Sequence, residues 1–509
     1  MKSKISTPKK IKAKNHSLKF KVKDMDIATG GTLVVILNAK DAHLLDLHSG
    51  DRILVKTNKK EQVCILDISE SQKAVPEGKI GLFEEVLDRL DLKNNQIVKI
   101  KFTGKPESVK HIRSKLYGKR LSYTELLHII DDITHDRLTD IEKTYFVAAG
   151  FIEGWNNEEV VDMTRAMVKT GYKLKFPGVT LDKHCIGGVP GNRTTMIVIP
   201  IIAAAGFTIP KTSSRAITSP AGTADTMECL ARVELPEGKI KNIVKKSKAC
   251  IVHGGSMNLA PADDKIIEVE HPLSIDAEGQ LLASVMAKKF SVSANHVLID
   301  IPMGKQVKVK NWKQAKHLKK MFKLIGRKLG MNVKVMITDG TQPIGNGIGP
   351  FLEAMDVMQV LKDDILAPQD LKHKSLMLAG TLLEMTGKYR KGKGLKVARE
   401  ILESGKAHKK MNEIIAMQGK QKKVNIGSYQ HIVKSTTIGR VKEIDNEVIA
   451  KIARMAGAPQ DKGSGLYINK KVHHPIKKGE VLYTIYAENE FKLGLAKEFA
   501  KKNHGYLIK

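Results

Sequence analysis

The stretch Asp182–Gly188 reads Asp-Lys-His-Cys-Ile-Gly-Gly, and the pair Thr194-Thr195 follows it closely. About thirty residues later comes a second stretch, Ser213–Asp225, which reads Ser-Ser-Arg-Ala-Ile-Thr-Ser-Pro-Ala-Gly-Thr-Ala-Asp. Both are rich in hydroxyl side chains and glycines and carry one or two cationic side chains. These groups bind oxyanions, because glycine leaves backbone N–H groups accessible, hydroxyls donate hydrogen bonds and a cation offsets the charge. The two stretches predict an enzyme that handles phosphate.

The segment between them, Met196–Phe207, is almost entirely apolar. An apolar run followed by a glycine predicts a buried helix that ends at Gly206. This helix would connect the two loops directly. We therefore expect both loops to lie at one end of the same fold unit.

The composition is that of a globular protein with more than one core. A chain of 509 residues predicts roughly three or four domains, and 42% of its residues are hydrophobic. The longest apolar run is too short for a membrane span of about 20 residues, and we expect no secretory signal peptide. The four cysteines, at positions 64, 185, 229 and 250, form no CxxC pair. We expect neither disulfides nor a metal site, and a cytoplasmic location.

The formal net charge of +32 is compatible with two classes of partner, nucleic acids and small anionic substrates. Nucleic-acid binding is disfavoured, because aromatic residues amount to 5% and no recognition motif is visible. We interpret most of the lysines as solvated surface whose field attracts phosphate and nucleotides toward a cleft.

The N-terminal part is expected to be a basic, disordered lead over residues 1–17, followed by short β-rich runs to about Phe102. These runs predict a small barrel-like domain with one or two helices. Residues 106–119 do not resemble a packed element, and we place a linker there. Helices follow, since Ser122–Glu125 and Thr139–Glu142 both have capping-box spacing.

Farther along, Asn157–Thr170 has the period of an amphipathic helix that Gly171 ends. Two apolar runs, Val297–Ile301 and Val333–Thr338, predict buried strands of an α/β region. From Ser428 onward β-like runs return, which predicts a C-terminal α+β domain.

The two loop sequences resemble the signature loops of the thymidine phosphorylase family. Their order and spacing fit that family, as does the downstream Leu259–Asp263, and the similarity extends from about Phe20 to the C-terminus. The N-terminal extension is similar to that of the second subfamily, which includes AMP phosphorylases and putative thymidine phosphorylases. The resemblance implies a cytoplasmic pentosyltransferase that forms at least a homodimer.

The expected fold is a multidomain α/β protein in which the helical domain is discontinuous and the central sheet is mixed; the discontinuity follows from the resemblance. The predicted domains are a basic lead and β-rich N-terminal domain (1–105), a helical domain (106–180 and 256–290), a central α/β phosphate-binding domain (181–255 and 291–427) and a C-terminal α+β domain (428–509).

The resemblance also implies a set of phosphate-binding residues: Lys183, Cys185, Thr195, Ser213 and Thr223. The family usually has serine at position 185, and a thiol is a much weaker hydrogen-bond donor. The neighbouring glycine-rich backbone could compensate for that donor.

Two residues of the loops keep alternative roles. His184 either contacts the base or sugar, as the motif implies, or only caps the loop. Arg215 either contacts the anion or braces the loop through Asp225.

In pyrimidine-specific members of the family an arginine, a serine and a lysine contact the base. Ser284 and Lys288 match the serine and lysine, but no arginine or lysine occurs between Ile266 and Ala283. AMP phosphorylases have the same gap, and in them an aspartate matching Asp276 is the expected proton donor to the purine. The alternative role of Asp276 is to cap the following helix.

A nucleotide substrate needs a second anion site for its 5′-phosphate. By resemblance to AMP phosphorylases the candidates are Gly188, Ser214, Arg215, Ala216, Ile217, Thr218, Ser219 and Lys308. Lys308 could instead be a solvated surface lysine.

The leading hypothesis is a phosphorylase that uses inorganic phosphate as co-substrate, without a cofactor, to cleave a nucleoside 5′-monophosphate or a nucleoside. Thymidine phosphorolysis is the alternative within this class. A nucleic-acid-binding protein with a vestigial catalytic fold is a second class of hypothesis. A phosphoribosyltransferase ranks last, because no acidic magnesium-binding cluster lies near the loops.

Overall fold

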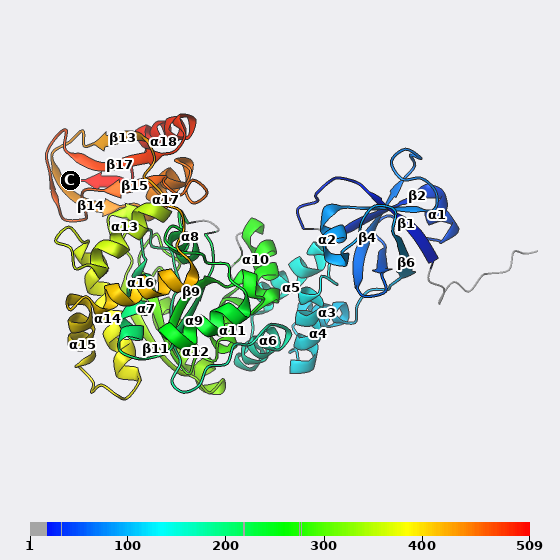
Figure 1. The fold of residues 1–509 in the computed structure, drawn as a ribbon, viewed down its shortest axis with the longest axis horizontal. Helices are drawn as coiled ribbons and strands as arrows, with labels where there is room; N and C mark the ends of the chain where they lie inside the picture. Colours follow the sequence, from blue (N-terminus) through cyan, green and yellow to red (C-terminus); the bar gives the residue numbers. More distant parts are fainter. Residues whose placement is uncertain (1–17, 32, 217–218, 274, 276) are drawn as a thin grey trace, which may run out of the picture. The chain divides into compact units, whose positions relative to one another are not determined.

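The computed structural model describes residues 18–31, 33–216, 219–273, 275 and 277–509 (Figure 1). The chain divides into two compact units. The first contains the chain up to Glu153 together with Lys265–Ile275, and the second contains Gly154–Asp264 and the chain from Ala277 onward. Each unit has its own internal contacts and is described separately.

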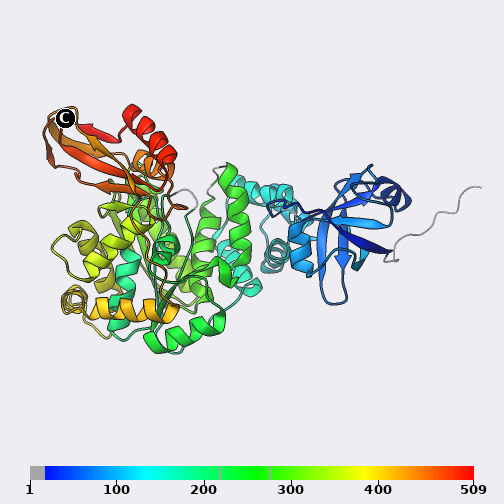
Figure 2. The same ribbon diagram turned by 45° about the horizontal axis from the view of Figure 1, so that its top comes forward.

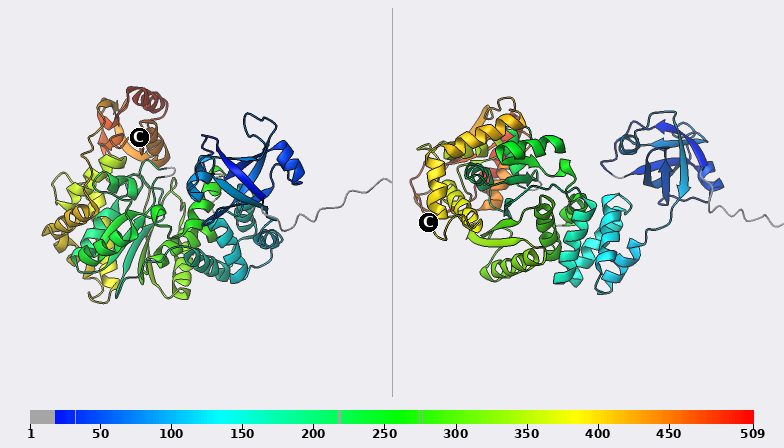
Figure 3. Two further views of the ribbon diagram at one scale, coloured as in Figure 1. Left: turned by 45° about the vertical axis from the view of Figure 1, so that its right-hand side comes forward. Right: turned by 60° about the horizontal axis from the view of Figure 1, so that its bottom comes forward.

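A closed β-barrel forms the N-terminal part of the first unit, drawn in blue in Figures 1 and 3. Closure pairs every strand on both sides, so the barrel has no exposed edge strand. Alternate residues such as Phe20, Val22, Val35 and Leu37 are buried in its core. In the order in which they neighbour one another, the strands are β1 (Leu18–Asp24), β5 (Lys79–Leu82), β2 (Val34–Asn38), β4 (Glu61–Ser69), β3 (Arg52–Lys56) and β6 (Ile97–Phe102).

Two short helices accompany the barrel, α1 (Ala39–Leu44) and α2 (Glu84–Leu90). The structure thus has the β-rich N-terminal domain with one or two helices that the sequence predicts.

Three helices follow in the same unit: α3 (Ser108–Leu116), α4 (Tyr123–Thr134) and α5 (Asp140–Glu153). The linker predicted over residues 106–119 is wrong, because most of it is α3, whose Ile112 is buried. The predicted capping box at the start of α4 is confirmed, with Ser122 and Glu125 each accepting the other's backbone N–H. A further helix, α10 (Pro261–Leu273), begins in the second unit and ends in the first.

The centre of the second unit is built on parallel strands. The strands β11 (Asn332–Asp339), β10 (His296–Met303) and β7 (Leu181–Cys185) pair in this order, and β8 (Ile209–Ser213) pairs with β9 (Ala249–His253). All of these pairings are parallel, so the predicted mixed sheet is wrong for the described strands of this region. Parallel strands place their carboxyl ends at one edge of the sheet, which is where α/β proteins bind ligands.

Helices surround these strands. The helix α7 (Thr194–Ala204) is the predicted apolar helix and is buried on all sides, since it carries apolar residues on every face. The predicted helix Asn157–Thr170 is confirmed as α6, with Gly171 at its C-terminal cap. The remaining helices here are α8 (Thr223–Glu228), α9 (Glu237–Ser247), the 3-10 helix Gly255–Met257, α11 (Glu278–Ser291), α12 (Trp312–Lys328), α13 (Pro350–Leu361), α14 (Gln369–Met385), α15 (Gly394–Glu403) and α16 (Lys406–Gln418).

The C-terminal part of the second unit is α+β, drawn in orange and red in Figure 2. The short strand β12 (Gly347–Ile348) joins its sheet β12-β15-β17-β13, which ties it to the central part. Among the described residues no helix has the length and apolar character needed to cross a membrane. The elements are β13 (Tyr429–Lys434), β14 (Gly439–Ile444), α17 (Asn446–Met455), β15 (Gly465–Ile468), β16 (Pro475–Ile476), β17 (Val481–Ala487), α18 (Glu490–Lys502) and β18 (Tyr506–Ile508).

Candidate active site at the carboxyl ends of the parallel strands

The first predicted anion loop follows β7, and its lysine is fully buried. The Nζ atom of Lys183 lies 2.8 Å from Thr194 Oγ1 and 3.3 Å from Thr195 Oγ1. These threonines begin α7, so the free N–H groups and positive dipole end of that helix lie beside the lysine. No ion pair joins Lys183 to a carboxylate in the described part of the chain. The predicted phosphate ligands Lys183 and Thr195 are thus brought together.

Cys185 belongs to the same group. Its Sγ atom lies 3.3 Å from the amide nitrogen Nδ2 of Asn192, whose Oδ1 accepts a hydrogen bond of 3.0 Å from Thr194 Oγ1. Burial, reinforced by the nearby carboxylate of Asp300, raises the pKa of the Cys185 thiol. The thiol therefore stays protonated and provides a weak donor beside the lysine–threonine group.

The opposite face of β7 carries Asp182 and His184, because side chains alternate along a strand. Asp182 is fully buried between two lysines: its Oδ1 lies 3.2 Å from Lys211 Nζ on β8 and its Oδ2 lies 3.0 Å from Lys289 Nζ on α11. Lys211 also donates to the carbonyl oxygen of Lys183 at 3.0 Å. One face of β7 thus carries the predicted phosphate ligands Lys183 and Cys185, and the other face is directed toward α11.

A second buried aspartate completes the cluster. Asp300 on β10 accepts a hydrogen bond of 2.6 Å from Thr338 Oγ1 and lies 3.3 Å from Lys374 Nζ on α14. Although burial acts in the opposite direction, the charges of Lys374 and Lys183 hold the pKa of Asp300 below its usual value.

The cluster therefore holds more cations than anions. Four buried lysines face two buried aspartates: Lys183, Lys211, Lys289 and Lys374, with Asp182 and Asp300. Buried charge without a counterion is costly, so an excess of this kind favours binding of an anion. Sequence reasoning missed Lys211, Lys289 and Lys374, because none of them belongs to a recognised motif.

Burial and mutual repulsion change the pKa values of the basic side chains in and beside the cluster. Burial lowers the pKa values of Lys183 and Lys289, although the carboxylate of Asp182 acts against this effect at Lys289. Burial together with the neighbouring lysines also holds the pKa of His184 well below its usual value. His184 is therefore a neutral imidazole at physiological pH, able to donate or accept a hydrogen bond.

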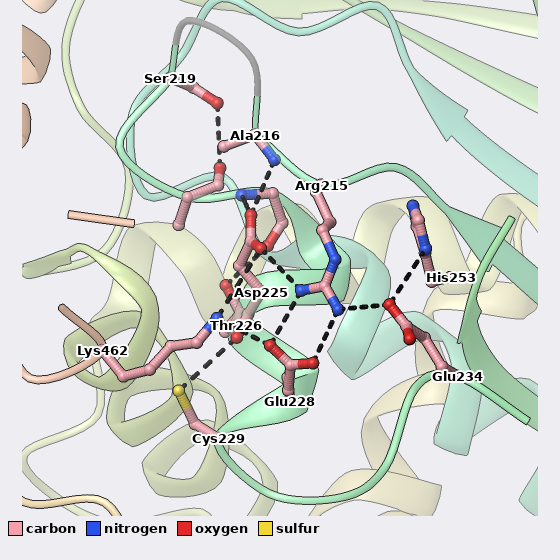
Figure 4. Close-up of polar contacts among 12 residues, drawn as sticks. Arg215, Ala216, Ser219, Asp225, Thr226, Glu228, Cys229, Glu234, His253 and Lys462 are labelled. Atoms are coloured by element: carbon pink, nitrogen blue, oxygen red, sulfur yellow. Dashed lines mark hydrogen bonds and ion pairs between the residues drawn. The ribbon is translucent and has the colours of Figure 1, made fainter. Parts of the chain in front are cut away.

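The second predicted loop follows β8 and ends in α8. The carboxylate of Asp225 closes it, since Oδ2 accepts hydrogen bonds from the backbone N–H groups of Ala216 at 2.7 Å and Gly222 at 2.9 Å (Figure 4). A β-carbon at Gly222 would lie 2.7 Å from the Ser214 carbonyl oxygen, so this close turn requires glycine. Two predicted substrate residues in this loop, Ile217 and Thr218, lie outside the described residues.

Arg215 is held by carboxylates rather than left open (Figure 4). Its two terminal nitrogens bind Glu228 at 2.8 and 2.7 Å, and further contacts reach Asp225 at 3.3 Å and Glu234 at 2.8 Å. These bonds raise the pKa of Arg215 and lower that of Glu228 to about 2. These contacts favour the bracing role, one of the two roles predicted for Arg215, and contact with the anion stays a prediction.

Arg193, which precedes α7, links the two loops. Its guanidinium donates to the carbonyl oxygen of Ala221 and, at 3.1 Å, to Thr226 Oγ1. Its Nε also pairs with the buried Glu353 of α13. The two predicted loops thus lie at the same end of neighbouring strands, as expected. Sequence reasoning did not single out Arg193 or Glu353.

The remaining predicted residues fall into two places. A β-carbon at Gly188 would lie 2.9 Å from the backbone nitrogen of Lys308, so these two candidates for the 5′-phosphate are neighbours. Ser284 and Lys288 lie one turn apart on α11, both partly exposed. Lys288 Nζ lies 2.7 Å from Asp263 Oδ2, and the carboxylates beside it raise its pKa against the effect of burial.

Ser219 and Asp276 are the last two predicted site residues. Ser219 donates from its Oγ to the carbonyl oxygen of Ala221 at 3.1 Å, inside the second loop. Asp276 lies outside the described residues. The next helix, α11, has Ala277 at its N-cap position, with no side-chain hydrogen bond capping it.

Three family models match the chain. Residues 109–171 match the helical bundle domain of a glycosyl transferase family, residues 178–408 its a/b domain, and residues 440–506 the pyrimidine nucleoside phosphorylase C-terminal domain. Both loops and the buried lysine cluster fall within residues 178–408.

Curated relatives match over almost the whole length. AMP phosphorylases from Methanococcus vannielii and Pyrococcus furiosus are 42% and 44% identical, covering 95% of this chain and 96% and 97% of theirs. A putative thymidine phosphorylase from Methylococcus capsulatus is 42% identical, covering 90% of this chain and 89% of its own. This chain belongs to the thymidine phosphorylase family.

Within that family the similarity is to the subfamily that contains AMP phosphorylases and putative thymidine phosphorylases, as the sequence indicates. Among solved structures, anthranilate phosphoribosyltransferase from Thermus thermophilus superposes with a TM-score of 0.51 at 17% identity. The superposition covers 60% of this chain and 98% of that one, and it shows a shared fold alone.

Proposed function

We propose that this protein is a phosphorylase that cleaves the N-glycosidic bond of a nucleoside 5′-monophosphate, with AMP as the leading substrate. Inorganic phosphate is the co-substrate, and the products are the free base and ribose 1,5-bisphosphate. One observation carries the proposal: a fully buried Lys183, bonded to two hydroxyls at a helix start, lies within a cluster of excess positive charge. The AMP phosphorylase names of the relatives support the same reaction.

The reaction needs little covalent chemistry from the protein. Phosphate attacks the anomeric carbon from the face opposite the base, and the C–N bond breaks through an oxocarbenium-like state. Positioning the dianion and neutralising its charge therefore supply most of the catalysis. Lys183 and the α7 threonines hold the phosphate, with Cys185, Ser213 and Thr223 as further donors.

The leaving purine accepts a proton or hydrogen bond as the C–N bond breaks. Asp276 is the proposed donor to the purine. His184 lies on the β7 face directed toward α11 and, as a neutral imidazole, is suited to contact the sugar or base.

A nucleoside monophosphate presents a second anion at its 5′ end. The proposed site for it is formed by Gly188, the loop residues 214–219 and Lys308. The close approach of Gly188 to the Lys308 backbone supports this assignment, because it makes two of the candidate residues neighbours. A nucleoside without the 5′-phosphate would lose these contacts.

Thymidine phosphorolysis is the second candidate. Ser284 and Lys288 match two of the three base-contacting residues of pyrimidine enzymes, and the Methylococcus capsulatus relative carries a thymidine phosphorylase name. The missing third cation between Ile266 and Ala283 disfavours it, because a pyrimidine carbonyl would lose its donor.

The test is phosphate-dependent release of base from AMP, CMP, UMP, thymidine and uridine. We expect turnover of AMP, weaker or no turnover of thymidine, and no release without phosphate. Turnover of thymidine with none of AMP would replace the first candidate by the second. No cofactor, a cytoplasmic location and a homo-oligomeric state remain part of this proposal.

A further inference from the structure

The loop between β8 and α8 is surrounded by more carboxylates than its own arginine can neutralise. Arg215 carries one positive charge, and three carboxylates bind it: Asp225, Glu228 and Glu234. Asp225 is almost fully buried, with 4% of its side chain exposed. Unbalanced negative charge here would oppose the approach of an anionic substrate.

The second cation of this group comes from a distant part of the chain. Lys462 Nζ lies 2.8 Å from Glu228 Oε2 and 3.8 Å from Asp225 Oδ1 (Figure 4). Lys462 falls within residues 440–506, which match the C-terminal domain, whereas the loop belongs to the a/b domain. The contact is therefore a charge bridge between two domains of one compact unit.

Lys462 stands on a segment with fixed backbone positions. Its carbonyl oxygen accepts a hydrogen bond of 3.0 Å from the N–H of Phe351, in the first turn of α13. The next residue, Gly463, donates its N–H to Glu488 Oε1 at 2.6 Å. The backbone that carries Lys462 is therefore fixed by hydrogen bonds to α13 and to Glu488, and only the side chain has to be ordered for the ammonium group to reach Glu228.

Two carboxylates, Glu228 and Asp225, connect Lys462 to the loop. Asp225 uses Oδ1 for the cations and Oδ2 for the backbone N–H groups of Ala216 and Gly222. Those two amides lie at the ends of residues 216–222, which include four of the predicted substrate residues, 216–219. The cations therefore hold in place the carboxylate whose other oxygen accepts both backbone hydrogen bonds.

We propose that Lys462 is a positioning residue through which the C-terminal domain holds the substrate loop Ser213–Asp225 in its binding conformation. It acts through Glu228 and Asp225 and does not touch the reacting atoms. The proposal rests on the proposed function for its kinetic consequences, while its structural consequence is independent of any substrate.

The variants are Lys462→Met, which keeps the length and removes the charge, and Lys462→Arg, which keeps the charge. The matched control is Lys492→Met: Lys492 pairs with Asp461, next to Lys462, at 2.6 Å, and contacts none of the three loop carboxylates. In Lys462→Met we expect KM for AMP to rise about tenfold with kcat changed by less than about threefold. Lys462→Arg restores the wild-type KM within about threefold, and Lys492→Met leaves it unchanged.

A second measurement reads the loop directly. Hydrogen exchange of the peptide containing the Ala216 and Gly222 amides should accelerate by about tenfold in Lys462→Met, but not in Lys492→Met. In Glu228→Gln, where the lysine has lost its principal partner, a further Lys462→Met change should add little.

The outcomes separate this proposal from the proposed function. If the wild type cleaves no nucleotide but the exchange rates change as expected, the positioning role stands and the substrate assignment fails. If AMP is cleaved and exchange and KM are unaltered in Lys462→Met, the positioning role is refuted. A fall in kcat alone, with unchanged exchange, would also refute it, since it would indicate direct contact with the reacting groups.

Discussion

Lys183 and Arg215 are the cations of the two predicted anion-binding loops, and their surroundings differ. Lys183 is fully buried and bonded to two neutral hydroxyls. Arg215 is one-third exposed and bound by three carboxylates. Lys183 therefore makes no direct ion pair among the described residues, whereas the guanidinium of Arg215 already donates to carboxylates.

This difference indicates how a cation in a motif acquires its role. A lysine that only hydroxyls contact keeps its charge for a ligand, and burial in a low dielectric strengthens that attraction. An arginine bound in a bidentate manner by a carboxylate is instead a structural tie. Both loops would look equally suited to bind an anion if their composition alone were considered.

The largest expected effect is on Lys183. Lys183→Met should lower kcat/KM for phosphorolysis by about 1,000-fold or more, because it removes a preorganised charge from the attacking phosphate. The thermal unfolding midpoint should not fall, since the change removes a buried charge without an ion pair. Steady-state kinetics and a thermal melt measure these two quantities.

The control for Lys183→Met is Lys334→Met, because Lys334 is an exposed lysine on β11. Retention of more than about a tenth of the activity in Lys183→Met would contradict the role of this lysine and remove the contrast with Arg215.

Arg215 should give a smaller and different effect. Arg215→Lys keeps the charge but loses the two-pronged contact with Glu228, so we expect KM for AMP to rise about 10- to 30-fold while kcat changes little. Limited proteolysis should cut the loop faster than in the wild type. A loss of kcat as large as that of Lys183→Met, with an unchanged proteolysis rate, would mean that Arg215 binds the anion itself.

Much of the fold could be predicted because local signals agreed with it. The bounds of α6 follow from an amphipathic repeat and a glycine at the end, and the structure has those bounds. The linker predicted over residues 106–119 was wrong because Pro106 and the basic residues scattered through α3 conceal its short apolar repeat. Strand direction could not be predicted either, since it depends on the crossovers and not on the strands themselves.

The site was predictable only where it is continuous in the sequence. Lys183, Thr195, Ser213 and Thr223 lie in two short stretches, and the structure brings the stretches to one edge of the sheet. The partners that decide their roles come from elsewhere: Lys374 from α14 and Lys462 from the C-terminal domain. A lysine in a polar context is ordinarily solvated, so nothing local marks these two as buried or bridging.

Cys185 offers a finer test of the Lys183 side. A serine hydroxyl is a stronger donor than a thiol and would still accept from Asn192. We expect Cys185→Ser to lower KM for phosphate by about threefold, and Cys185→Ala to raise it by a similar factor. Equal KM values in all three proteins would place the side chain of residue 185 outside the phosphate site.

The smallest expected effect is the contribution of the Glu228–Arg215 contact to the free energy of unfolding. The pKa of Glu228 is lowered from 4.5 to about 2, chiefly by its hydrogen bonds to Arg215. The resulting stabilisation is fully present above pH 4.5 and is lost as the pH falls toward 2. Because the group is partly exposed, we discount the contribution to about 1 kcal/mol.

The measurement compares thermal unfolding of the wild type and Glu228→Gln at pH 6 and pH 3. The difference between the two proteins should be largest at pH 6 and shrink at pH 3, where the wild-type carboxylate begins to lose its advantage. Glu490→Gln, an exposed glutamate in the first turn of α18, is the control and should show no such trend. A difference independent of pH would mean that Glu228 stabilises the loop by packing, and Arg215 would then be held by Asp225 and Glu234 alone.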